Sequence, residues 1–173
     1  MSTTPLYSVA ESPLGLRAAA FRRVLTTGPL FKGMLAVRMP LLALAGARIE
    51  RLDLDRCEVR LPHGWRSQNI FGSTYFAATL MAAEAACGTI VLLHEQNSPH
   101  KFGPIVKSIK ADFTRAAYSD IVFRCTQGDA VAEWLERAHD SRERVETTLD
   151  VVGSTEEGEV ARVSVTWSAR LKI

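Results

Sequence analysis

One stretch decides the fold: residues 74–93 read TYFAATLMAAEAACGTIVLL and carry a single charged residue, Glu84. Its length alone would suit a membrane-spanning helix. However, it is rich in small residues, and a charge in mid-span costs about 2.5–3.5 kcal/mol on membrane insertion. A helix that is apolar on every side is also typical of the buried central helix of a globular protein. We therefore expect a buried core helix and not a membrane span.

The composition is that of a soluble globular domain. The chain has 173 residues, of which 47% are hydrophobic and 23% charged, and these values exclude intrinsic disorder and a disulfide-stapled miniprotein. A net charge of +2 gives no electrostatic argument for a nucleic-acid partner. The first ten residues lack a signal-peptide pattern, so we expect a cytoplasmic protein.

Cysteines and histidines give no sign of a metal site or a cofactor. The cysteines are widely spaced, which indicates buried thiols and neither a zinc site nor a disulfide framework. They are Cys57, Cys87 and Cys125. The histidines are expected in loops or near helix ends, on the solvated surface. They are His63, His94, His100 and His139. We therefore expect no bound metal and no cofactor.

The segments around the long helix predict a mixture of helices and strands. Residues 14–47 are rich in Ala and Leu and predict two or three short helices, interrupted at Gly28-Pro29 and Met39-Pro40 because proline breaks helices. Residues 49–61 alternate between apolar and polar and predict two half-buried strands with a break near Asp55. We treat residues 1–47 as a helical extension and 48–173 as the main domain of one structural unit.

The second half of the chain is mostly strand. Residues 105–118 and 120–126 alternate as strands do, and residues 128–139 have helical spacing. Two further strands, 144–152 and 159–171, are joined by a polar turn. Runs of antiparallel strands around one helix indicate the α+β class, with a curved antiparallel sheet wrapped around the long helix.

A polar loop precedes the long helix and has features of a binding site. Residues 69–76 read NIFGSTYF, and Ser73 or Thr74 is expected to cap the helix. Gly72 would let a substrate approach the backbone closely. The unpaired N–H groups at the helix start, at the positive end of its dipole, would stabilise a developing oxyanion.

Glu84 is the second candidate for a residue with a functional role. A lone carboxylate among alanines should have a raised pKa, which favours a role as general base. In the alternative, it pairs with Lys107, Lys110 or Arg115 and only stabilises the fold. Gly72 precedes Glu84 by 12 residues, about 18 Å along a helix. Both can act on one carbonyl only if a second copy supplies one of them, so catalysis requires a symmetric dimer.

These residues resemble a known family. Asn69, Gly72 three residues later and Glu84 on the helix are similar to the Asn-x-x-Gly motif and helix acid of hotdog-fold acyl-CoA thioesterases of the phenylacetate-pathway type. The segments GSTYFAA at 72–78 and MAAE at 81–84, with Gly88, resemble more specifically the uncharacterised hotdog branch called DUF4442. The resemblance covers about residues 30–171.

The resemblance implies a hotdog-fold homodimer, or a dimer of dimers, that hydrolyses acyl-CoA. Glu84 would be the general base or nucleophile, and Asn69 would orient substrate or water. The sequence departs from the pattern because Tyr75-Phe76-Ala77 replace His-Gly-Gly. The oxyanion contact would then come from the backbone N–H of Tyr75 or Phe76, or from the Tyr75 hydroxyl. In the alternative, Asn69 only caps the loop, and the two aromatic residues pack in the core.

The remaining substrate contacts follow from the same arrangement. Ser73, Tyr75 and Phe76 would contact the substrate at the helix start, and the acyl chain would run past Phe71, Met81 and Ala85. Basic residues could meet the phosphates of coenzyme A or be plain surface. They are Arg66, Lys101 and Lys107.

Two other functions fit the same scaffold. A non-catalytic acyl or lipid carrier is favoured by the missing His-Gly-Gly and by the apolar helix. A dehydratase is disfavoured because no histidine lies within residues 69–84. The apolar residues of 1–47 could cover the sheet, form a lid over a tunnel or lie on a membrane, and we expect them to pack on the domain or the dimer.

Overall fold

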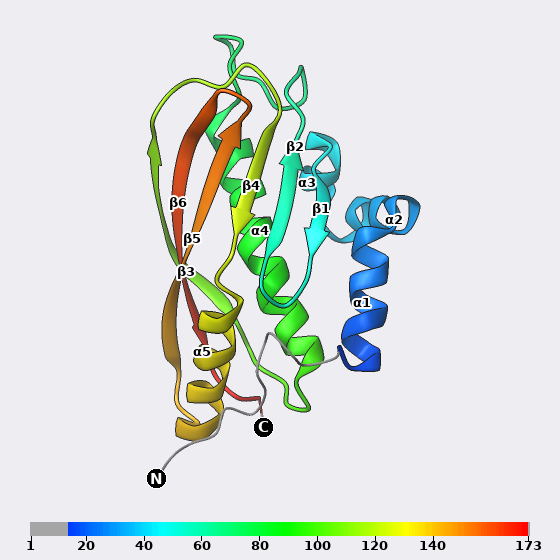
Figure 1. Ribbon diagram of the computed structural model, residues 1–173, viewed down its shortest axis with the longest axis vertical. Coiled ribbons are helices and arrows are strands. Elements are labelled where there is room, and N and C mark those ends of the chain that lie inside the picture. The colour runs from blue at the N-terminus through cyan, green and yellow to red at the C-terminus, as the bar shows by residue number, and fades with distance from the viewer. Residues whose placement is uncertain (1–13, 173) are drawn as a thin grey trace.

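The computed structural model describes residues 14–172, and Figure 1 shows how the elements are arranged. The helices are α1 (Leu16–Thr26), α2 (Gly28–Arg38), α3 (Pro40–Ala45), α4 (Phe76–Asn97) and α5 (Gly128–Ser141). The strands are β1 (Arg48–Leu52), β2 (Cys57–Leu61), β3 (Ile105–Phe113), β4 (Ile121–Cys125), β5 (Val145–Thr155) and β6 (Gly158–Ala169). This order confirms the α+β class.

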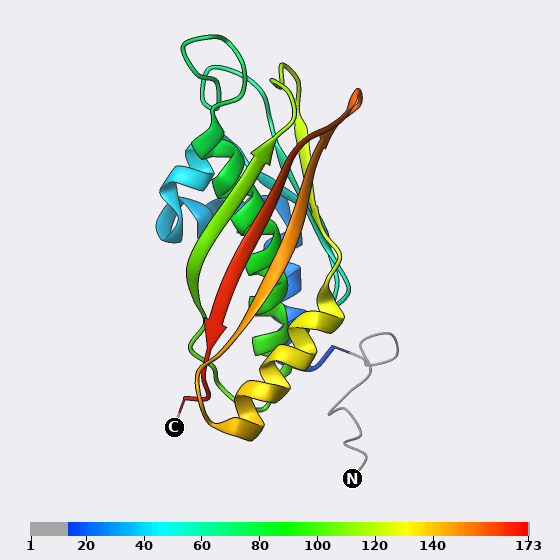
Figure 2. The same cartoon turned by 90° about the vertical axis from the view of Figure 1, so that its left-hand side faces the viewer.

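A six-stranded antiparallel sheet with the order β1-β2-β4-β5-β6-β3 curves around α4 (Figure 1 and Figure 2). The sheet, together with the other helices, buries most of α4; Ala82, Ala83 and Ala86 are fully inaccessible to solvent. By length and composition alone α4 could cross a membrane. Its burial inside the protein confirms the expected core helix.

The three N-terminal helices cover one side of the core. They are separated at Thr27 and Met39, which confirms the predicted breaks before Pro29 and Pro40. The helices lie beside α4 and β1 (Figure 1) and bury apolar side chains such as Leu25, Phe31 and Leu35 against the core. The block therefore packs on the domain, as expected.

The strand predicted over residues 105–118 is shorter and more exposed than its alternating pattern suggested. It ends at Phe113, and the side chains on both of its faces are exposed except for the partly buried Ala111. The reason is its position: β3 pairs only with β6 and forms one edge of the sheet. An edge strand with one side unpaired presents free backbone N–H and C=O groups on which another chain can pair.

His94 differs from its expected place on the surface. The helix continues to Asn97, so His94 lies within α4 and is fully buried. Its Nε2 donates to the carbonyl oxygen of Leu54 at 2.9 Å, which ties the end of α4 to the turn between β1 and β2. The three cysteines are free and buried, as predicted.

Candidate functional site

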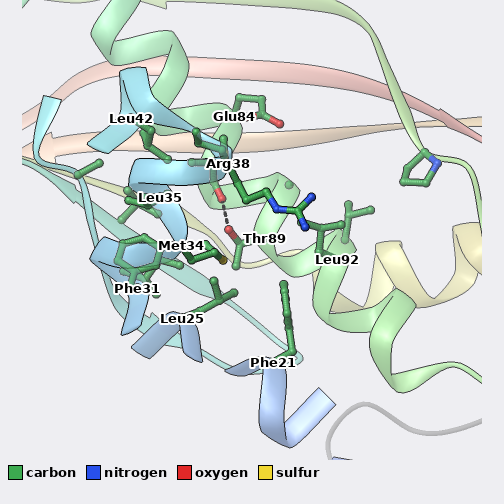
Figure 3. Close-up of a pocket in the computed structure, with 18 of the residues that line it drawn as sticks. Phe21, Leu25, Phe31, Met34, Leu35, Arg38, Leu42, Glu84, Thr89 and Leu92 are labelled. Carbon is green, nitrogen blue, oxygen red and sulfur yellow. Dashed lines mark hydrogen bonds between the residues drawn. The ribbon is translucent and has the colours of Figure 1, made fainter. Parts of the chain in front are cut away.

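Glu84 lies at a large apolar cavity (Figure 3). Its side chain is partly buried in the middle of α4. The cavity has a volume of about 590 Å³ and extends between α4, the N-terminal helices, β1 and β2. Its walls include Phe21, Leu25, Phe31, Met34, Leu35 and Leu42. The carboxylate therefore sits at the boundary of an apolar space of ligand size.

The Glu84 carboxylate forms no hydrogen bond or ion pair within residues 14–172. The basic residues expected as alternative partners are engaged elsewhere: Lys107, Lys110 and Arg115 pair with Glu146, Asp112 and Glu157, respectively. The prediction that Glu84 serves only as an ion-pair partner of these residues is therefore wrong. Burial raises the pKa of Glu84 above its ordinary value, because desolvation penalises the charged form.

Gly88, one helical turn after Glu84, makes room for the carboxylate. A Cβ atom at Gly88 would lie 2.8 Å from Glu84 Oε1 and 3.3 Å from the Trp167 ring. The glycine therefore leaves space that the carboxylate and the Trp167 ring occupy. A larger residue at position 88 would therefore displace the Glu84 carboxylate or the Trp167 ring.

The start of α4 differs from the expectation. The helix begins at Phe76 with Tyr75 as its N-cap, and no side chain caps it; the prediction that Ser73 or Thr74 does so is wrong. Instead, Ser73 Oγ accepts a hydrogen bond from Asn69 Nδ2 at 3.0 Å. Thr74 Oγ1 lies 3.1 Å from His63 Nδ1. Both hydroxyls serve the preceding loop.

Asn69 organises this loop. Its Oδ1 accepts a hydrogen bond from the Phe71 N–H at 2.9 Å, while its Nδ2 bonds to Ser73. Gly72 has a φ of 82°, a conformation that favours glycine, and its N–H donates to the Asn69 carbonyl oxygen. These bonds account for Asn69 as a loop residue, and its contact with a substrate stays a prediction.

Three backbone N–H groups remain available at the start of α4. The Tyr75 N–H is used, since it donates to the Ser67 carbonyl oxygen at 2.7 Å. The N–H groups of Phe76, Ala77 and Ala78 donate no hydrogen bond to any residue that the structure describes. Unpaired donors at a helix start can hold an anion, so this is the candidate oxyanion site.

Phe76, the first residue of the candidate oxyanion site, lines a second cavity. This cavity, of about 340 Å³, is lined by Asn69, Thr74, Phe76 and Phe113 among others, and shares no lining residue with the cavity at Glu84. From Phe76 to Glu84 there are eight residues of helix, about 12 Å. One chain therefore keeps the base and the oxyanion donors apart.

The other predicted substrate contacts fall in different places. Phe71, Tyr75 and Phe76 are exposed and line a surface hollow together with Asn69. Ala85 lines the cavity at Glu84, whereas Met81 and Phe71 are not among its described wall residues. Lys107 forms an ion pair on the surface.

The sequence did not indicate which residues form the cavity walls. Arg38 and Thr89 line the cavity at Glu84 together with the N-terminal helices. Arg38 is exposed and forms no ion pair with a described residue, while the Thr89 hydroxyl donates to the Ala85 carbonyl oxygen at 2.6 Å. The only indication in the sequence was that residues in α1–α3 are rich in apolar side chains. This did not show which face of these helices lies against α4.

Comparison with solved structures supports the expected fold. A protein of unknown function from Pseudomonas aeruginosa, named a probable thioesterase, superposes with a TM-score of 0.69 and 22% identity over 86% of this chain and 99% of that one. A putative thioesterase from Shewanella oneidensis gives 0.70 and 10% over 86% and 99%. A thioesterase from Haemophilus influenzae gives 0.60 and 14% over 86% and 95%. The fold is thus the hotdog fold.

Sequence comparison gives the family. No functionally curated protein matches the chain. The model of the family DUF4442, a domain of unknown function, matches residues 27–169, which span α2 to β6. The chain therefore belongs to the DUF4442 family, on a hotdog fold with a desolvated glutamate on its central helix.

Proposed function

We propose that the protein is a thioesterase that hydrolyses acyl-CoA or a similar thioester at a site shared by two subunits. One observation carries the proposal: the Glu84 carboxylate, without a partner among the described residues, stands at the wall of an apolar cavity. An apolar cavity fits an acyl chain, and a carboxylate with a raised pKa is suited to take a proton from water. The likeness of the fold to thioesterases is consistent with this chemistry.

The reaction has two forms that both use Glu84. As a general base, the carboxylate takes a proton from water while the water oxygen bonds to the thioester carbon. The carbonyl oxygen becomes an oxyanion; when it collapses, the C–S bond breaks and the leaving thiolate takes a proton. As a nucleophile, the carboxylate itself bonds to the carbon and expels the thiolate, and water then cleaves the resulting anhydride.

A second subunit completes the site. The Phe76, Ala77 and Ala78 N–H groups would stabilise the oxyanion, but Phe76 lines a cavity separate from that of Glu84. In a twofold dimer whose axis is perpendicular to α4, the two α4 helices run in opposite directions, so the start of one helix can lie opposite Glu84 of the other. The exposed edge of β3 is the surface on which we place this pairing.

Acyl binding without hydrolysis is the second candidate function. It is favoured by the same apolar cavity and by Tyr75-Phe76-Ala77 in the place of His-Gly-Gly. The two candidates differ in one observable, which is release of free thiol from a bound acyl-CoA.

The test is thiol release from an acyl-CoA panel by the wild type and by Glu84→Gln. A thiol-reactive dye suits this protein because its cysteines are buried, and burial raises the pKa of Cys125 to about 11. We expect the substitution to lower kcat by about 10²–10⁴-fold, the contribution of a positioned base. Turnover by the glutamine variant at the wild-type rate would contradict the proposal, and binding without thiol release by the wild type would identify a carrier.

The pH profile gives an independent check. A general base acts only when it is deprotonated, and the pKa of Glu84 is raised by burial. We therefore expect wild-type kcat to fall with decreasing pH at a higher pH than the ordinary carboxyl range. The residual rate of Glu84→Gln should lack this decline. An acid limb that is unchanged in the variant would assign it to another group.

A further inference from the structure

The N-terminal helices form part of the wall of the cavity at Glu84. Three helices from the N-terminal block, α1–α3, form one side of it, and the central helix and the sheet form the other. Figure 3 shows Phe21, Leu25, Phe31 and Met34 pointing into this space, with Glu84 at its opposite end from Phe21. The N-terminal block therefore does more than cover the core, because it encloses space next to the candidate base.

The chemistry of the walls selects the ligand. The described wall residues with a polar or charged side-chain group are Glu84, Thr89, Arg38 and Trp167. The Thr89 hydroxyl already donates to a backbone carbonyl oxygen, and Arg38 is exposed. The Trp167 indole N–H forms no hydrogen bond with a described residue, but it is inaccessible to solvent. The accessible interior is therefore mostly apolar, with the Glu84 carboxylate as its main polar group. An aliphatic chain satisfies such a space, whereas a polar acyl group would lose hydrogen bonds to water on entry.

The dimensions also fit a chain. Glu84 and Leu92 both line the cavity and are separated by eight residues of α4, about 12 Å along the helix axis. This length exceeds what an acetyl group would fill. The volume of about 590 Å³ lies within the range of small-molecule sites, roughly 300–1,000 Å³.

We propose that α1–α3 form the acyl chamber of this protein, in which a linear aliphatic acyl chain of medium length lies between these helices and α4 with its thioester carbonyl at Glu84. The proposal rests on the thioesterase function and names its substrate class. The N-terminal helices then set which acyl chains bind, while Glu84 acts on the carbonyl.

The test uses a variant that fills the chamber and a matched control on the same helix. Met34 of α2 is partly buried and lines the cavity, whereas Val37 of α2 is 80% exposed and does not line it. Binding of decanoyl-CoA, acetyl-CoA and coenzyme A alone is measured by calorimetry in the Glu84→Gln background, which prevents turnover. We expect decanoyl-CoA to bind at least about 10-fold more tightly than acetyl-CoA, because burial of each further CH₂ in the apolar cavity strengthens binding. Met34→Trp should remove this advantage, and Val37→Trp should keep it.

A second variant covers the case in which Met34→Trp does not fold. Phe21 of α1 is partly buried at the end of the cavity away from Glu84. Phe21→Ala lengthens the chamber, so the chain that binds most tightly should become longer, for example from decanoyl to tetradecanoyl. Thermal melts of all variants confirm that they are folded.

The outcomes separate the two proposals. If decanoyl-CoA binds no better than acetyl-CoA, or if neither Met34→Trp nor Phe21→Ala changes the chain preference, the acyl chamber is overturned. This holds even if the wild type hydrolyses thioesters. If the chain preference follows these substitutions but the wild type releases no thiol, the chamber stands and the thioesterase function is overturned.

Discussion

At the residue scale, two features define the surroundings of the Glu84 carboxylate. It lacks a cationic partner within the described chain, and its neighbour Gly88 lacks a side chain. The sequence predicted the buried carboxylate, because a single acidic residue in the middle of an apolar helix is buried when that helix forms the core. The sequence could not show that Lys107 and Arg115 do not pair with Glu84. These residues pair with Glu146 on another strand and Glu157 in a turn, respectively, and such contacts depend on the fold.

Gly88→Ala should separate positioning from folding. The added Cβ would lie 2.8 Å from Glu84 Oε1, so the flexible carboxylate must move while the helix gains up to about 1 kcal/mol of propensity. We expect a thermal midpoint close to that of the wild type and a kcat at least about 10-fold lower, since small misplacements of reacting groups are costly. Gly33→Ala, with no atom within 4 Å of its Cβ, is the control. An unchanged kcat in Gly88→Ala would show that the position of the carboxylate does not matter.

At the element scale, the helices and strands were predicted from the spacing of apolar residues and from the positions of the prolines. The breaks before Pro29 and Pro40 and the long helix were predictable because their signals are local. The start of α4 was not, because the side chains of Ser73 and Thr74 bond to Asn69 and His63 instead of the helix. The exposure of β3 depends on its place at the sheet edge, which no local pattern contains.

The packing of α5 on the turn between β1 and β2 gives a stability prediction. A Cβ at Gly128 would lie 1.8 Å from the Leu54 carbonyl oxygen, a backbone atom that cannot move aside as a side chain does. Gly128→Ala should therefore reduce the free energy of unfolding by about 3 kcal/mol or more, at the upper end for overpacking. Urea denaturation measures this, with Gly33→Ala expected to change stability by less than about 1 kcal/mol. Equal stability of the two variants would contradict the tight contact.

At the scale of the whole molecule, the two halves of the proposed site lie apart in one chain. The cavity at Glu84 and the cavity at the start of α4 share no wall residue, and the unpaired edge of the sheet at β3 is exposed. The sequence already implied a second copy from the spacing of Gly72 and Glu84. The structure changes which residues this argument uses. The backbone N–H groups without a described acceptor belong to Phe76, Ala77 and Ala78, whereas the Gly72 N–H donates to the Asn69 carbonyl oxygen.

The proposed pairing through β3 predicts the effect of a charge at its centre. Ile109 is 41% exposed on this edge, so Ile109→Lys should leave the protomer folded but oppose pairing, as charges on edge strands do. We expect light scattering to give a dimer for the wild type and a monomer for Ile109→Lys, with loss of thiol release. Val37→Lys, on α2 and 80% exposed, should remain dimeric and active. A dimeric Ile109→Lys would place the interface elsewhere.

The shared site can be tested by complementation between two inactive variants. Phe76 is the first residue of α4, and Tyr75 before it is extended, so proline fits at this position and removes one free N–H. Phe76→Pro should lower kcat by about 10²–10³-fold, the effect of losing an oxyanion donor. Phe76→Ala keeps the N–H and controls for loss of the ring.

The most direct measurement is thiol release by heterodimers of Glu84→Gln and Phe76→Pro, co-expressed with different tags. One of the two sites in each heterodimer combines an intact Glu84 with an intact helix start from the other subunit. We predict that purified heterodimers recover about half of the wild-type rate per dimer, because twofold symmetry gives two equivalent sites. Activity no higher than that of either variant alone would contradict a site shared between subunits.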